Sequence, residues 1–336
     1  MAAVAILAQG RGPILPEFRA PGPHSKMLAR AAMSLVRPAV RAPSTLESAM
    51  ANQARFAATM KAVKIRMRSV KNIQKITKAM KMVAAAKLRH DQKRMEIGLP
   101  FCRPVQDLFQ RLPHNDKPDK GPVTMLTVAS DKGLCGGINT FAAKFTRLNL
   151  YEYEASGLPV KLFIHGSKGT AALQRLFADR FTTTIAEAGN KHPVNFTSAC
   201  AIVERLIRHN PERLRLTFNE FISVMSYETR HVEMITKAQV DQMDKMDVSK
   251  AMDVYSFEPP TTECWDDLHE FYYACSFYGA WLQSATSEQS SRMSAMENAS
   301  KNAGEMFDAL ELQYNRARQA KITTELCEII SGASAV

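Results

Sequence analysis

A glycine-rich loop is the stretch of this sequence whose residue types come closest to a phosphate-binding motif. It reads SDKGLCGGIN, residues 130–139, and it follows an apolar run and precedes a helical pattern, which is where phosphate-binding loops lie. Its glycines are Gly133, Gly136 and Gly137. They match neither the G-x-G-x-x-G spacing of dinucleotide sites nor the G-x-x-x-x-G-K-[ST] spacing of P-loops. We therefore predict a tight structural turn at these glycines, with a small phosphate site as the alternative.

The other reactive side chains also lack the spacing of an active site. Cys135 lies in the loop, but no constellation of histidine and acid around it can be read from the sequence. The six cysteines, at positions 102, 135, 200, 264, 275 and 327, show neither close pairing nor metal-ligand spacing, which indicates reduced thiols. The histidines, among them His165 and His269, form no metal pattern. We expect no catalytic residue, no metal site and no cofactor.

Basic residues are concentrated near the N-terminus. Residues 61–98 contain twelve Lys or Arg and two acids, a net charge of +10. Such a stretch could attract nucleic-acid phosphates, yet it contains no Phe, Tyr or Trp on which bases would stack. An acidic protein surface is the favoured partner, and a nucleic-acid scaffold is the alternative.

The first 59 residues have the composition of a targeting segment. They contain seven Lys or Arg, and their only acids are Glu17 and Glu47. This composition, together with abundant Ala and Ser, is typical of a mitochondrial transit peptide. We predict removal of this leader shortly before Met60; an ordinary basic tail is the alternative.

Proline placement predicts two long helices, because proline breaks helix interiors. All sixteen prolines lie within residues 13–43 or 100–260. Residues 265–332 would span about 100 Å as one helix at 1.5 Å per residue. A helix of that length must project from the globular part and find a partner along it.

Apolar residues mark the expected contact face of each helix. Near the C-terminus they follow heptad spacing at Met293, Met296, Ala303, Phe307, Leu310, Tyr314 and Ala317. The stripe then shifts, which indicates a change of partner surface, to Ile322, Leu326, Ile329 and Ala333. The N-terminal face contains Val63, Val70, Ile73, Thr77, Met80 and Ala84, widened by Ile65, Ile76 and Val83. We predict an antiparallel pair of these helices; separate packing of each on a globular body is the alternative.

The region between the helices alternates strand and helix patterns. We expect strands at 123–129 and 160–166, helices at 139–156, 167–179 and 196–209, and a hairpin of strands 216–227 and 231–240. This order predicts a compact α/β domain with a mixed sheet. The expected divisions are a leader over 1–59, a helix and turn over 60–112, the α/β domain over 123–257 and the C-terminal helix over 263–336.

Three blocks of the sequence resemble the γ subunit of F-type ATP synthase. They are IRMRSVKNIQKITKAMKMVAAAKL at 65–88, SDKGLCGGIN at 130–139, and EQSSRMSAMENASKNAGEMFDALELQYNRARQAKITTELCEIISGASA at 288–335. Residues 140–260 match in pattern only, and residues 1–59 lie outside the family domain. The resemblance implies an antiparallel, curved coiled coil of the two termini, together with a central Rossmann-like α/β domain. It also implies a noncatalytic shaft that turns inside a ring of three α and three β subunits.

The resemblance further implies contact residues. The positions beside the acidic lever loops of the β subunits are Lys75, Lys78, Met80 and Lys81, although the three lysines could simply be exposed helix residues. A family arginine that ion-pairs with the β subunit corresponds to Arg292. The positions that hydrogen-bond to the upper, catch-like loop are Arg318, Gln319 and Thr323, with Glu288 and Glu325 at neighbouring family positions. The tip that turns in an apolar collar runs over 329–336 and includes Ile329, Ile330 and Val336.

The partners implied by the resemblance are the α3β3 hexamer, the central-stalk δ and ε subunits, and the c-ring of Fo. Contact with the membrane, the mitochondrial inner membrane on its matrix side, would occur only through the complex, and no nucleic acid is expected. Some photosynthetic relatives carry an inserted cysteine-containing redox switch; no closely spaced pair occurs here, so we expect no thiol regulation of that type. A basic coiled-coil scaffold for nucleic acid and a nucleotide-dependent α/β enzyme are the alternative functions.

Overall fold

The computed structural model describes residues 45–112, 121–189, 193–241, 243, 248, 250–258 and 261–334. The chain forms two compact units, Met1–Ala58 and Thr59–Val336. The second unit contains the sheet, the helices that cover it and the paired parts of two long helices. Residues 1–44 of the predicted leader lie outside the described residues.

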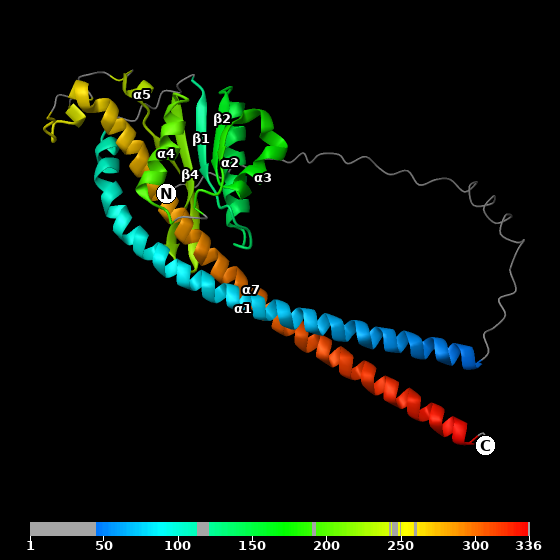
Figure 1. The fold of residues 1–336 in the computed structure, drawn as a ribbon. Coiled ribbons are helices and arrows are strands. Elements are labelled where there is room, and N and C mark those ends of the chain that lie inside the picture. Colours follow the sequence, from blue (N-terminus) through cyan, green and yellow to red (C-terminus); the bar gives the residue numbers. More distant parts are fainter. Residues whose placement is uncertain are drawn as a thin grey trace, which may run out of the picture. The chain divides into compact units, whose positions relative to one another are not determined.

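A five-stranded mixed sheet with the strand order β3-β2-β1-β4-β5 forms the centre of the second unit (Figure 1). Its strands are β1 (Val123–Val128), β2 (Val160–His165), β3 (Phe181–Ile185), β4 (Arg213–Ser223) and β5 (Ser226–Met234). The first four are parallel, and β5 pairs with β4 in the antiparallel direction. Every residue of β1 is buried, as expected for a central strand covered on both faces. The mixed sheet predicted from the sequence is confirmed.

Helices cover both faces of this sheet. Their bounds are α2 (Ile138–Ala155), α3 (Ser167–Phe177), the 3-10 helix η2 (Ala178–Arg180), α4 (Phe196–Ile207) and α5 (Lys237–Asp241). Alternate residues of β1 point to opposite faces, so Met125 packs with α2 and α3 while Leu126 packs with α4. The core on the α4 side also contains residues of both long helices, and it anchors them to the sheet.

The predicted hairpin exists, but its turn lies elsewhere. Strand β4 ends at Ser223 and β5 begins at Ser226, so the turn lies at Val224 and Met225 and not after residue 227. No Gly, Pro or Asn-Gly pair marks this turn in the sequence. Strand β3 was not predicted at all, because it is a five-residue edge strand whose positions alternate between half-buried and exposed.

The two long helices are α1 (Thr45–Gln110), with 66 residues, and α7 (Thr261–Ser334), with 74 residues. Helix α1 continues through Pro100 and Pro104, beyond the end of the proline-free segment. Each proline removes a backbone hydrogen bond and bends a helix, and α1 curves toward this end (cyan in Figure 1). Beyond the prolines, Leu108 and Phe109 are buried in the core beside the sheet.

Buried His269 of α7 makes this core sensitive to acid. The residue is 3% exposed and its ring centroid lies 4.8 Å from that of Phe109, and burial lowers its pKa to about 4. The unfolded chain has an ordinary histidine pKa of about 6.5, so below that pH it binds a proton that the folded chain excludes. The stabilisation is therefore complete above pH ~6.5 and is lost as the pH falls toward 4.

We expect the unfolding free energy to drop by about 2–3 kcal/mol between pH 7 and pH 4.5 on account of His269. Urea unfolding of the full chain at both pH values measures this difference. His269→Phe should reduce the measured drop by about this amount, while buried His165, whose pKa burial also lowers, still contributes; His209→Phe, at an exposed position, should leave the drop in place. An equal acid sensitivity in the His269→Phe protein and its parent would contradict the assignment.

Candidate functional site

Helices α1 and α7 pair in antiparallel order (Figure 1). Lys71 Nζ lies 5.5 Å from the ring centroid of Phe307. Two turns and more along α1, Lys81 Nζ lies 2.6 Å from Glu297 Oε1. Residue numbers therefore rise along α1 in the direction in which they fall along α7. The predicted antiparallel pair is confirmed.

The seam of this pair follows the heptad spacing closely. On α1 the buried seam positions are Val63, Val70, Thr77 and Ala84, seven residues apart. On α7, Met296 and Ala303 are buried, and the other predicted seam positions are half-buried, namely Met293, Phe307, Leu310, Tyr314 and Ala317. The small Ala84 side chain, 1% exposed, allows the helices to approach closely at this level.

Part of the predicted contact face on α1 is wrong. The exposed members of that face are Ile65 (58%), Ile73 (52%), Ile76 (57%), Met80 (38%) and Val83 (57%). The physical reason is geometric, since a two-helix pair buries only the narrow a and d stripe of each helix. These five residues therefore form a second apolar surface on α1, outside the seam, which we call the outer face.

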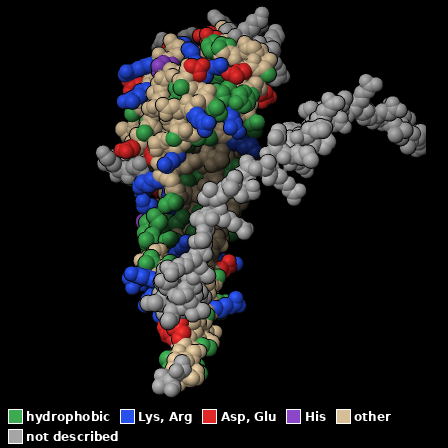
Figure 2. Space-filling view, turned by 90° about the vertical axis from the view of Figure 1, so that its right-hand side faces the viewer, with side chains coloured by type: hydrophobic (Ala, Val, Ile, Leu, Met, Phe, Trp, Pro, Cys, Tyr) green, Lys and Arg blue, Asp and Glu red, His purple; other side chains and the backbone are tan. Residues whose placement is uncertain are grey.

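Lysines lie along the same stretch of α1, on other sides of the helix. Lys75 and Lys78 are exposed, and Lys81 is half-exposed in its ion pair with Glu297. Figure 2 shows hydrophobic and Lys or Arg side chains beside one another on the narrow part of the molecule. A helix segment that exposes apolar side chains on one side and cations on others is suited to partners with apolar and acidic groups around it.

The end of α7 is also exposed. Ile322, Leu326, Ile329 and Ile330 are 55–68% exposed, so the shifted stripe has no cover within the described chain. Arg318, Gln319 and Thr323 are exposed on the same segment, and Thr323 Oγ1 donates a hydrogen bond to the Gln319 carbonyl oxygen at 3.0 Å. Val336 lies outside the described residues.

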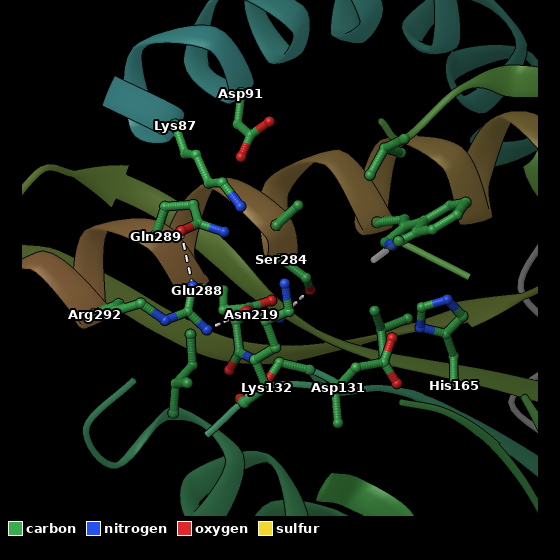
Figure 3. Close-up of a pocket in the computed structure, with 18 of the residues that line it drawn as sticks. Lys87, Asp91, Asp131, Lys132, His165, Asn219, Ser284, Glu288, Gln289 and Arg292 are labelled. Atoms are coloured by element: carbon green, nitrogen blue, oxygen red, sulfur yellow. Dashed lines mark hydrogen bonds and ion pairs between the residues drawn. The ribbon is translucent and has the colours of Figure 1, made fainter. Parts of the chain in front are cut away.

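Arg292 differs from the other predicted contact residues because it is directed into the chain. Its guanidinium donates to Glu288 Oε1 at 2.5 Å and to Gln289 Oε1 at 2.7 Å, and its side chain is 13% exposed. These α7 residues line one wall of a pocket of about 280 Å³ (Figure 3). Other walls include Lys87 and Asp91 of α1, and Asp131 and Lys132 after β1. Contact of Arg292 with a β subunit stays a prediction, and it would require this arginine to share or exchange its present partners.

Two ion pairs lie in this pocket. Burial raises the pKa of Glu288, and the Arg292 guanidinium acts in the opposite direction because it favours the ionised carboxylate. Burial likewise raises the pKa of Asp91, which pairs with Arg94 at 2.9 Å. Within the described part of the chain, no group of three or more His, Cys, Asp or Glu side chains is placed to hold a metal ion. Each of these ion pairs lies within one helix, α1 or α7, beside the loop that follows β1.

The glycine-rich loop packs against α7. Gly136 has φ +65°, and a Cβ there would lie 3.0 Å from Ser291 Oγ. Ser291 Oγ donates a hydrogen bond to the Cys135 carbonyl oxygen at 2.6 Å, and a Cβ at Gly137 would lie 2.7 Å from the Phe141 ring. Gly133 is less constrained, since a Cβ there would meet only Lys168 at 3.6 Å. Burial raises the pKa of the Cys135 thiol, which makes it a poorer nucleophile.

Comparison with known proteins decides between the functions considered from the sequence, namely a γ subunit, a nucleic-acid scaffold and a nucleotide-dependent enzyme. A family profile described as ATP synthase matches residues 59–336. The mitochondrial ATP synthase γ subunit of Ipomoea batatas is 40% identical over 280 residues, which cover 82% of this chain and 84% of that one. The mitochondrial γ subunit of Drosophila melanogaster is 36% identical over 308 residues, which cover 90% of this chain and all of that one. The chain belongs to the γ-subunit family of ATP synthase.

The solved structures agree with this family. A chain in the central stalk and c-ring structure of the Tetrahymena thermophila mitochondrial ATP synthase is 33% identical, with a TM-score of 0.57, and the match covers 67% of this chain and 99% of that one. As a γ subunit, the protein is the central-stalk rotor subunit of ATP synthase and is itself noncatalytic. None of its described helices carries an apolar segment that could cross a bilayer.

Sequence reasoning missed the pocket in Figure 3. One signal for it was present, because Asp131 and Lys132 follow directly on a buried strand, and side chains at the carboxyl ends of parallel strands commonly line pockets. The contribution of α1 to the same pocket, through Lys87 and Asp91, carries no sequence signal, since it depends on where the long helix crosses the sheet.

Proposed function

We propose that the outer face of α1 and the exposed end of α7 contact the β subunits, and that their unequal surfaces couple rotation of γ to the conformations of the catalytic sites. The observation that supports this is the exposure of apolar and cationic side chains along the same stretch of α1, Met80 with Lys75 and Lys78. A γ subunit that met no partner there would leave this surface in water at a cost of about 25 cal/mol per Å² of apolar area.

The coupling follows from symmetry. Three identical β subunits around an asymmetric rod each meet a different side of it. Each side shifts the conformation of its β subunit by the difference in contact free energy between the two conformations, and by no more. Because coupling is reciprocal, nucleotide-driven closure of a β subunit must in turn push on the rod. A noncatalytic subunit can thus drive synthesis or be driven by hydrolysis.

The same proposal covers the remaining partners and the location. The helical pair lies inside an α3β3 hexamer, and the sheet domain lies beside the δ and ε subunits and the c-ring, on the matrix side of the mitochondrial inner membrane. Two points support this: the Tetrahymena neighbour comes from a central stalk and c-ring structure, and the family match begins at residue 59, after the segment with transit-peptide composition. The exposed Ile329 and Ile330 suit an apolar collar around the tip.

Co-purification tests this proposal. A tagged copy of the chain, extracted from mitochondria in mild detergent, should bring down α and β subunits in excess over itself, together with the small stalk subunits and the c-ring. Ala84→Asp is the control, because a buried carboxylate in the seam should separate the helices and abolish recovery of the hexamer. Recovery of the intact chain without α and β, or with nucleic acid, would contradict the proposal.

Removing single contacts at the α7 end is expected to destabilise the complex slightly. Gln319→Ala and Thr323→Ala should each weaken the complex by about 0.5–1.5 kcal/mol through a lost hydrogen bond. Subunit dissociation of the purified complex in increasing urea measures this. Thr324→Ala is the matched control, since the Thr324 hydroxyl also donates within the helix, to the Ala320 carbonyl oxygen at 2.9 Å, but lies on an adjacent side. Normal stability and turnover in both variants would count against the assigned contacts.

A further inference from the structure

Three helices bring three cysteines of this chain to one apolar junction. Cys102 lies on α1, Cys200 on α4 and Cys275 on α7. Their neighbours interlock as edge-to-face aromatic pairs: Phe101 lies 5.3 Å from Phe196 and 5.8 Å from Phe271, measured between ring centroids. Each of the three cysteines follows one of these rings by one residue or by one helical turn. Cysteines that are far apart in the sequence therefore meet where the base of the helical pair joins the α/β domain.

Two of these thiols lie where α1 and α7 are in contact. Cys102 and Cys275 are both fully buried. A Cβ placed at Gly279, one turn beyond Cys275, would lie 3.8 Å from Cys102 Cβ, so the two helices are in contact at this level. Interaction with Cys275 lowers the pKa of the Cys102 thiol, and interaction with Cys102 raises the pKa of the Cys275 thiol.

We propose that Cys102 and Cys275 form a dithiol site that peroxide oxidises to a disulfide joining α1 to α7. In the first step the Cys102 thiol releases its proton and the thiolate attacks hydrogen peroxide; the O–O bond breaks, a sulfenic acid forms, and the departing hydroxide takes up the released proton to become water. In the second step the Cys275 sulfur attacks the sulfenic sulfur, its proton passes to the departing hydroxide, and a second water leaves. The two thiols lose two electrons and two protons, and one peroxide becomes two waters.

Local opening of α1 gives the oxidant access to this buried pair. Pro100 and Pro104 lie on either side of Cys102 and have no N–H, so the carbonyl groups of Glu96 and Pro100 lose their helical hydrogen-bond donors. A helix segment with fewer backbone hydrogen bonds opens at a lower free-energy cost than its neighbours. Closure of the segment then brings the modified Cys102 back to Cys275.

The disulfide would join two parts of the rotor and would leave the stator untouched. We therefore expect oxidised enzyme to keep its rate of ATP hydrolysis while the γ subunit resists unfolding at higher urea concentrations than in the reduced enzyme. A cross-link between rotor and stator would instead stop turnover.

The test uses the assembled complex treated with hydrogen peroxide, alkylated, digested without reduction and analysed by mass spectrometry. The expected product is a Cys102–Cys275 peptide pair lighter by about 2 Da than the two reduced peptides, because two hydrogens are lost. Cys102→Ser should abolish it. Cys200→Ser is the matched control, since it removes a thiol from the same junction and should leave the product unchanged.

Exposed Cys327 reports whether enough oxidant was present. If Cys327 becomes oxidised while Cys102 and Cys275 remain alkylatable as thiols after brief denaturation, the proposal is overturned. A Cys200–Cys275 disulfide in place of the expected pair would overturn it as well. Loss of ATP hydrolysis in step with the Cys102–Cys275 product would refute the expected freedom of the rotor.

Discussion

Met80→Lys is expected to impair coupling, so that fewer protons are pumped for each ATP hydrolysed by the reconstituted enzyme. Met80 is 38% exposed on the outer face of α1, in the same stretch as Lys75 and Lys78. A new ammonium group there would form an additional charge-assisted contact with acidic loops of the β subunits, worth about 1.5–3 kcal/mol. One rotor position would then be over-populated by roughly tenfold to a hundredfold, and rotation past it would be slowed.

Met82→Lys is the matched control for this variant. It makes the same chemical change two residues away, at a position that is 63% exposed and lies about 200° around the helix, on the side that carries Lys75 and Lys78. Proton pumping in vesicles and ATP hydrolysis are measured on the same preparation. An unchanged pumping ratio in Met80→Lys would argue against the contact, and an equal loss in both variants would show that added positive charge acts without regard to position.

Gly166→Ala should destabilise the α/β domain by about 3 kcal/mol or more. Gly166 connects β2 to α3 with φ +105°, and its N–H donates to the Ile185 carbonyl oxygen at 2.8 Å. A Cβ there would lie 2.3 Å from the carbonyl oxygen of Ala129 and 2.6 Å from its carbonyl carbon. Because the obstacle is backbone of the neighbouring strand, no side-chain rotation can relieve the clash.

Gly157→Ala measures the cost of the positive-φ backbone conformation without a steric clash. Gly157 also has positive φ, +75°, but a Cβ there meets nothing within 4 Å, so only the conformational cost of about 1 kcal/mol remains. Tryptophan fluorescence follows unfolding in urea, since Trp281 packs in the core 4.8 Å from the His165 ring. Equal losses in the two variants would mean that the backbone at Ala129, just after β1, shifts to accept the methyl group.

The sheet shows which strands can be predicted from sequence patterns and which cannot. Strand β1 was predicted well because six consecutive buried residues give a continuous apolar run, which central parallel strands require. Strand β3 and the turn between β4 and β5 were missed or misplaced because they lie at sheet edges, where one side of the strand meets water and the residue types constrain the structure weakly. The position of the Val224–Met225 turn is set by pairing with β4, which is a tertiary property.

The candidate site divides in the same way. The apolar end of α7 and the exposed Lys75 and Lys78 could be expected from composition and from resemblance. The inward direction of Arg292 could not, because its partners Glu288 and Gln289 lie on the same helix, and only the crossing of α1 and the loop after β1 determines which side of that helix is covered.

The amino-acid sequence alone determined that two long terminal helices exist and pair along heptad seams, because the absence of proline and the 3–4 spacing of apolar residues act through the helix itself. Tertiary structure alone decided which apolar residues of α1 lie in the seam and which lie on the outer face, since a second helix covers only a narrow stripe and its position cannot be read from one helix. It also decided that Cys102 and Cys275 lie where α1 contacts α7. Contacts of this kind depend on how helices cross, and the sequence periodicity of either helix does not contain that information.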